Sequence, residues 1–121
     1  MKKKFLGYVC CFVLLTCSKG FSQSAGELNS IKIIEKGIEL HDSKKYDEAI
    51  IEYKKISRSD SNYVLAATEL VTTYIASGKD SLAVELCSDL LKIPSSYIPK
   101  LLALKGNALD NIKKSDEAIK R

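Results

Sequence analysis

An internal repeat constrains the fold of this chain more than any other feature of its sequence. Gly37 and Gly106 stand in similar surroundings, and the same interval separates each of them from the alanine of an Asp-Glu-Ala-Ile sequence, Ala49 or Ala118. A third alanine, Ala83, lies almost midway between Ala49 and Ala118. The resulting period of about 34 residues is typical of stacked helical hairpins, in which each repeat buries its apolar face against its neighbours.

The apolar residues between these positions recur at intervals of three and four, which is the period of an α-helix. Ile33, Gly37 and Leu40, for example, fall on one helical face. Clusters of Ser, Asn, Asp, Gly and Pro separate the apolar stretches and indicate turns. We therefore predict an all-α fold of antiparallel helix pairs, with helices over residues 27–42, 46–58, 63–77, 80–92, 97–111 and 115 onward.

Small and aromatic residues at the repeated positions have packing roles in this prediction. A glycine inside a helix costs about 1 kcal/mol of helix propensity relative to alanine, so we expect two helices to approach closely there. The alanines keep the second helix of each pair close to the first, and tyrosines fill the gaps between neighbours. The residues with these expected structural roles are Gly37, Tyr46, Ala49, Tyr53, Ala83, Gly106 and Ala118.

The segment from Gly37 to Ile56, with the sequence Tyr-Asp-Glu-Ala-Ile inside it, resembles a tetratricopeptide repeat (TPR). The resemblance covers a domain over residues 30–121, divided into repeats at about 30–63, 64–98 and an incomplete 99–121. It implies a short solenoid in which the first helix of each repeat lines a groove that binds a protein or peptide.

By this resemblance, the groove-facing residues are Ile34, Ile38, His41, Thr68, Thr72, Ile75, Ala103, Asn107 and Asp110. A second interpretation of the two isoleucines remains open. Apolar residues on two faces of a helix indicate burial all round as well as a binding groove, so Ile34 and Ile38 could simply widen the buried stripe.

The leader, residues 1–22, has the pattern of a secretory signal peptide, and residues 23–29 form a linker into the first helix. Three lysines precede an apolar run over residues 5–17, which is too short to span a bilayer as a helix. In an alternative interpretation, the sequence Leu-Leu-Thr-Cys that ends at Cys17 resembles a bacterial lipobox, whose cysteine is acylated. We therefore expect an exported protein, either periplasmic or secreted, or anchored to the membrane as a lipoprotein if Cys17 is lipidated.

The net charge of +4 does not predict a nucleic-acid partner. Four of the 19 basic residues lie in the leader, as Lys2, Lys3, Lys4 and Lys19, and the 15 that remain are balanced by 15 acidic residues. The mature domain therefore lacks the basic surface that nucleic-acid binding requires.

No arrangement of residues predicts catalysis. His41 is the only histidine, and Cys87 is the only cysteine outside the leader, so neither a metal site nor an activated thiol is expected. Two pairs of carboxylates four residues apart, one of them Glu85 and Asp89, are interpreted as solvated side chains on polar helix faces. We predict a protein that is not an enzyme and needs no cofactor or metal.

Two functions of different classes follow from this pattern. One is a protein–protein interaction scaffold of the bacterial cell envelope. The other is the N-terminal sensory or docking region of a larger signalling protein or enzyme. A further alternative, an envelope-assembly lipoprotein, depends on anchoring through Cys17. A sixth helix from Ser115 to Arg121 would be too short to be stable alone. We therefore expect Leu102 and Leu109 to be partly uncovered, and this end to be completed by further chain or by association.

Overall fold

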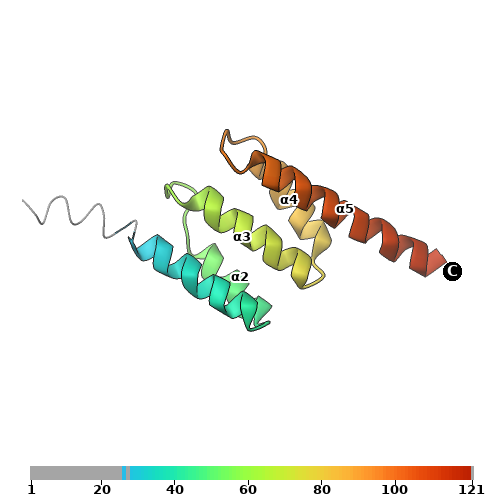
Figure 1. Cartoon of the computed structure of the whole chain (residues 1–121), viewed down its shortest axis with the longest axis horizontal. Helices are drawn as coiled ribbons and strands as arrows, with labels where there is room; N and C mark the ends of the chain where they lie inside the picture. Colours follow the sequence, from blue (N-terminus) through green and yellow to red (C-terminus); the bar gives the residue numbers. More distant parts are fainter. Residues whose placement is uncertain (1–25, 27, 121) are drawn as a thin grey trace, which may run out of the picture.

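The computed structural model describes residue 26 and residues 28–120, and this part of the chain is helical and contains no strand (Figure 1). The helices are a first helix over residues 28–42, α2 (Tyr46–Lys54), α3 (Tyr63–Ala76), α4 (Asp80–Leu90) and α5 (Ile98–Lys120). The predicted all-α fold class is therefore confirmed. The predicted signal peptide over residues 1–22, including Cys17, lies outside the described residues.

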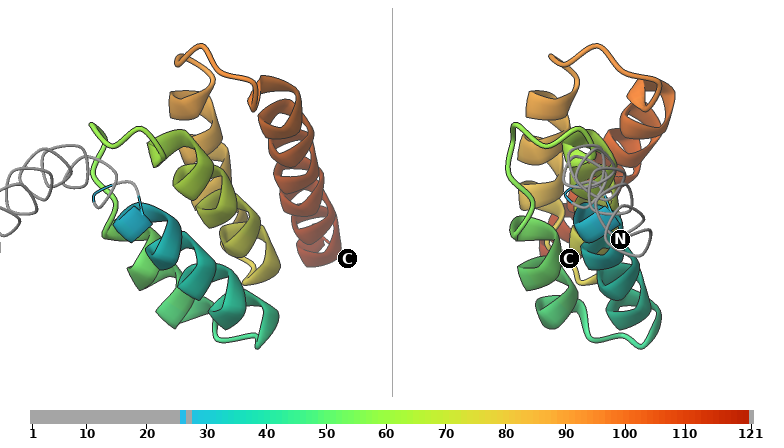
Figure 2. Two further views of the ribbon diagram at one scale, coloured as in Figure 1. Left: turned by 60° about the vertical axis from the view of Figure 1, so that its left-hand side comes forward. Right: turned by 90° about the vertical axis from the view of Figure 1, so that its left-hand side faces the viewer.

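Consecutive helices run antiparallel and alternate between two layers (Figures 1 and 2). The first helix, α3 and α5 form one layer, and α2 and α4 form the other. Helix α3 is central, because it contacts α2, α4 and α5. We call the outward surface of the first helix, α3 and α5 the first-layer face.

Apolar side chains on the facing sides of the helices make one continuous core. Ala49 on α2 and Ala83 on α4 are both 0% exposed, so the two equivalent alanines lie in equivalent buried places. Val71, Leu90 and Leu101 fill the space around them, and each is also fully buried. Full burial of such side chains stabilises a fold by about 1.5–3 kcal/mol each.

The tight turns inside the first two helix pairs repeat at the backbone level. Lys44 has φ of 63° and Gly78 has φ of 80°, and these residues are one repeat period apart. After each of them, the next N–H donates to the carbonyl five residues earlier, over 2.8 Å from Lys45 and 2.7 Å from Lys79. Glycine adopts this left-handed conformation without strain, as Gly78 does. Lys44 adopts the same conformation, but its side chain makes it strained.

The first helix and α2 approach closely at Gly37. A Cβ atom added to Gly37 would lie only 2.4 Å from Cε1 of Tyr53, whose side chain is 3% exposed. The absence of a side chain at Gly37 therefore makes the space that the Tyr53 ring occupies. Tyr53 in turn covers the inner face of the first helix.

The structure contradicts the predicted break between a fifth and a sixth helix, because α5 runs unbroken from Ile98 to Lys120. A turn like that at Lys44 would place Lys113 in the left-handed region, at a cost of roughly 1–2 kcal/mol for a residue other than glycine. In the first pair this cost is offset by packing of α2 on the first helix. Among the described residues, no helix comes after α5 that could pack back on it and offset this cost.

The expected roles of Gly106 and Ala118 are consequently wrong for this structure. No neighbouring atom lies within 4 Å of a Cβ atom added to Gly106, and Ala118 is exposed, because α5 does not fold back on itself. As expected, Leu102 and Leu109 are uncovered, with exposures of 55% and 47%.

The predicted ends of α2 and α4 were also too late, by four and two residues. Each helix closes with a tighter three-residue turn. Lys55 N–H donates to the Glu52 carbonyl over 3.1 Å, and Lys92 N–H donates to the Asp89 carbonyl over 3.2 Å. Such turns commonly end an α-helix.

Candidate binding surface

The first-layer face brings together predicted groove residues from three helices. Ile38, Ala103, Asn107 and Asp110 are exposed on it, whereas His41, Thr72 and Ile75 are half-buried. Helix α3 lies between the other two and contacts α5 directly. An ion pair between Lys100 of α5 and Glu69 of α3, with 3.7 Å between Nζ and Oε1, spans the boundary of these helices.

Two predicted groove residues are core residues instead. Ile34 is 4% exposed and Thr68 is 0% exposed, so neither is available to a partner. The Thr68 hydroxyl donates to the Val64 carbonyl of its own helix over 2.6 Å, which satisfies it without a ligand. The burial interpretation therefore holds for Ile34, which widens the buried stripe, whereas Ile38 is 36% exposed and remains at the surface.

His41 ties the first helix to α3. Its Nδ1 lies 2.9 Å from the Thr73 hydroxyl, which itself donates to the Glu69 carbonyl over 3.0 Å. Because the Thr73 proton is used there, His41 Nδ1 is the donor to Thr73. The imidazole also meets the Tyr46 ring edge-on, with 5.3 Å between ring centroids. These contacts give His41 a structural role beneath the edge of the first-layer face.

Tyr53 lies below the same region, between the first helix, α2 and α3. Its hydroxyl is buried and has no hydrogen-bond partner among the described residues. Burial, and after it the negative charge of Glu69, raises the pKa of Tyr53 to about 12. The phenol is therefore neutral at ordinary pH and acts as a packing group.

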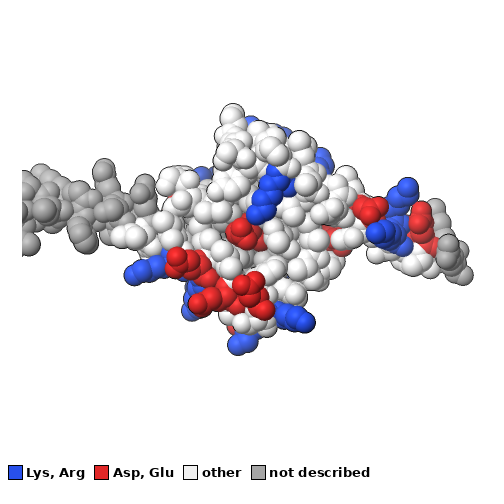
Figure 3. Space-filling model, viewed as in Figure 1, with Lys and Arg blue, Asp and Glu red and all other residues white. Residues whose placement is uncertain are grey.

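Sequence reasoning missed Ile31, which is 40% exposed on the first helix. It lies two helical turns before Ile38, so both fall on one helical stripe, and this spacing was the available signal. Exposed Glu35, Glu39 and Asp42 flank the two isoleucines. Figure 3 shows acidic side chains gathered over the first helix, whereas the surface over α3 and the start of α5 is mostly uncharged and the end of α5 carries both acidic and basic side chains.

Cys87 is fully buried, and burial raises the pKa of its thiol, so it behaves as a small apolar residue of α4. Within residues 28–120, no three His, Cys, Asp or Glu side chains gather in a way that could hold a metal ion. None of the helices that the structure describes is long and apolar enough to cross a bilayer.

The fold and the surface define a class: an all-α protein of antiparallel helix pairs with exposed apolar residues on both layers. Comparison of the chain with protein-family models, curated proteins and solved structures gave no match.

Proposed function

We propose that this protein is an interaction scaffold that binds a peptide or protein on its first-layer face. The observation that carries the proposal is the exposure of Ile31 and Ile38, at 40% and 36%, on the outer side of a packed helix. Half-buried Thr72 and Ile75 on α3 and exposed Asn107 on α5 extend this surface with apolar and neutral polar groups. Such a mixture favours contact with another polypeptide rather than chemistry on a small substrate.

We further propose that the helix pairs form a TPR-like stack, for which the first-layer face is the groove side. The left-handed turns at Lys44 and Gly78 are one repeat period apart, which supports this proposal. The full burial of both Ala49 and Ala83 supports it as well. The backbone angles and the burial are properties of the structure, whereas the spacing of the two alanines already entered the period inferred from the sequence.

The proposed location is the bacterial cell envelope, after export directed by residues 1–22. Mass spectrometry of the mature N-terminus tests this proposal. A free N-terminal Gln23 would indicate a periplasmic or secreted protein, whereas an acylated Cys17 would indicate a lipoprotein. An N-terminus that still begins at Met1 in the cell would contradict export by either route.

The function is tested by capture of partners from envelope extracts with the full chain and two matched variants. Ile38→Glu places a charge on the first-layer face, and Ile51→Glu places the same charge on α2, where Ile51 is 60% exposed. We expect Ile38→Glu to reduce capture about tenfold or more, as for a residue central to an interface, and Ile51→Glu to leave capture intact.

Circular dichroism of both variants must retain the helical signal of the parent. Asn107→Arg provides a second test on the same face, since Asn107 is exposed and its replacement leaves the core intact. Undiminished capture by both Ile38→Glu and Asn107→Arg would contradict the proposal.

A further inference from the structure

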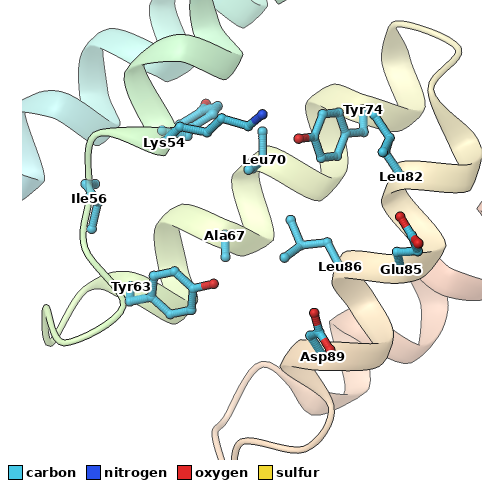
Figure 4. Close-up of a pocket in the computed structure, with 11 residues that line it drawn as sticks. Lys54, Ile56, Tyr63, Ala67, Leu70, Tyr74, Leu82, Glu85, Leu86 and Asp89 are labelled. Atoms are coloured by element: carbon cyan, nitrogen blue, oxygen red, sulfur yellow. The ribbon is translucent and has the colours of Figure 1, made fainter.

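A hollow of about 360 Å³ lies between α2 and α4, with α3 as its floor (Figure 4). It opens between the two helices of the second layer and is therefore separate from the first-layer face. Its volume is near the lower end of the range of roughly 300–1,000 Å³ that is usual for ligand sites. It can accept one large side chain with its neighbouring backbone.

The bottom and one wall of the hollow are apolar. Ala67 and Leu70 of α3 form the floor, and both are at least nine-tenths buried. Leu86 of α4 points across this floor, and Leu82 of the same helix is 45% exposed (Figure 4). An apolar side chain placed here would cover Leu82 and gain contacts with the floor, which favours burial of a residue such as Leu, Ile or Phe.

Polar groups surround this apolar bottom in an asymmetric way. The hydroxyl groups of Tyr63 and Tyr74 point into the hollow from α3 (Figure 4). Glu85 and Asp89 stand one helical turn apart on the α4 wall, and Lys54 stands on the α2 wall. One side of the hollow is therefore acidic and the opposite side is basic.

The acidic wall has little compensation from the protein itself. Glu85 takes part in no ion pair among the described residues, whereas Asp89 pairs only with Lys92, over 3.8 Å, and both of these side chains are largely exposed. An exposed pair of this length is weak, so the two carboxylates remain available to a cation from outside.

We propose that this hollow is a second binding site, for a peptide segment in which a Lys or Arg lies beside a large apolar side chain. The apolar side chain fills the space over Ala67 and Leu70, and the base pairs with Glu85 and Asp89. Lys54 on the opposite wall repels a second base and favours an acidic residue, so the peptide binds in one orientation.

The site is tested by nuclear magnetic resonance titration of the ¹⁵N-labelled full chain with three short acetylated peptides. The central pair of residues is Leu-Arg in the first peptide, Leu-Glu in the second and Ser-Arg in the third. We expect the Leu-Arg peptide to shift the amide signals of Ala67, Leu70, Leu82 and Leu86. The Leu-Glu peptide lacks the basic side chain and the Ser-Arg peptide lacks the large apolar side chain, so each should bind at least threefold more weakly.

Charge-neutral variants separate this site from general attraction to an acidic surface. Glu85→Gln with Asp89→Asn should weaken binding of the Leu-Arg peptide about three- to tenfold, since two exposed ion pairs are lost. The matched control is Glu35→Gln with Glu39→Gln, which removes two carboxylates at the same spacing from the first-layer face. We expect the control to change binding less than twofold.

Four results would overturn the proposal. The first two are signal shifts confined to the first-layer face and equal binding of the Leu-Arg and Leu-Glu peptides. The others are equal loss of binding in the two double variants and the absence of any shift at millimolar Leu-Arg peptide. None of these results contradicts capture through Ile38, so the two proposed sites succeed or fail separately.

Discussion

Alanine at Gly106 should stabilise the protein and alanine at Gly37 should not, although both glycines lie inside helices at equivalent places in the repeat. Each substitution gains about 1 kcal/mol of helix propensity. At Gly37 the new methyl group would also meet three atoms of the Tyr53 ring, at 2.4, 2.7 and 2.9 Å. The ring would have to move by about 1 Å to reach ordinary contact distance, and it is buried.

Overpacking of this kind costs about 1–3 kcal/mol. Gly37→Ala should therefore range from neutral to about 2 kcal/mol destabilising, because the propensity gain is subtracted. Gly106→Ala meets no atom within 4 Å and should stabilise by about 1 kcal/mol. The difference between the two variants isolates the steric cost and should be about 1–3 kcal/mol.

Urea unfolding followed by circular dichroism measures both variants against the parent. The Tyr53→Leu background provides a further check, because the shorter side chain removes the ring atoms nearest to Gly37. In that background, Gly37→Ala should behave like Gly106→Ala. Equal stabilisation by the two alanines in the parent chain would refute the close approach of the first helix and α2 at Gly37.

Three further predictions follow from the described contacts. The pKa of Tyr53, about 12, lies above that of an exposed tyrosine. The stability that the neutral phenol contributes is therefore complete below about pH 10 and is lost as the pH rises toward 12. Urea unfolding at pH 7 and pH 11 should show that Tyr53→Phe loses less stability in alkali than the parent. Lys44→Gly should stabilise the protein by about 1 kcal/mol, because glycine adopts the left-handed conformation without strain, and Gly78→Ala should destabilise it by a similar amount. Melting temperatures that shift in the same direction in both variants would contradict this account of the turns. Hydrogen exchange should leave residues 115–120 unprotected and residues 63–76 best protected, and uniform protection along α5 would contradict the exposure of its end.

Local rules predicted most of the helical structure, because the signals that begin and end these helices lie within a few residues of each other. The turn at Gly78 is an example, since glycine there both ends α3 and permits the left-handed conformation. The missing turn near Lys113 shows where local reasoning stops. The sequence around Lys44 and Lys113 is alike, yet the chain turns at Lys44 and continues as helix through Lys113, so the local sequence alone does not decide between a turn and a helix.

The candidate surfaces were less accessible from the sequence than the fold. Helical phase placed Ile38 and Asn107 at the surface, but it also assigned Ile34 and Thr68 there, because phase alone does not say how many neighbours a helix has. The hollow beside Leu82 depends on the separation of α2 and α4 across α3. That separation is a property of the tertiary structure, and no spacing in the sequence encodes it directly.

Site-specific photo-crosslinking in the cell envelope tests the central claim, that partners bind on the first-layer face. A photoreactive phenylalanine derivative would replace Ile38 in one variant of the full chain and Ile51 in another; both residues are exposed, on different layers. We predict a discrete light-dependent adduct of higher mass from position 38 and none from position 51. An adduct from position 51 with none from position 38 would contradict the claim.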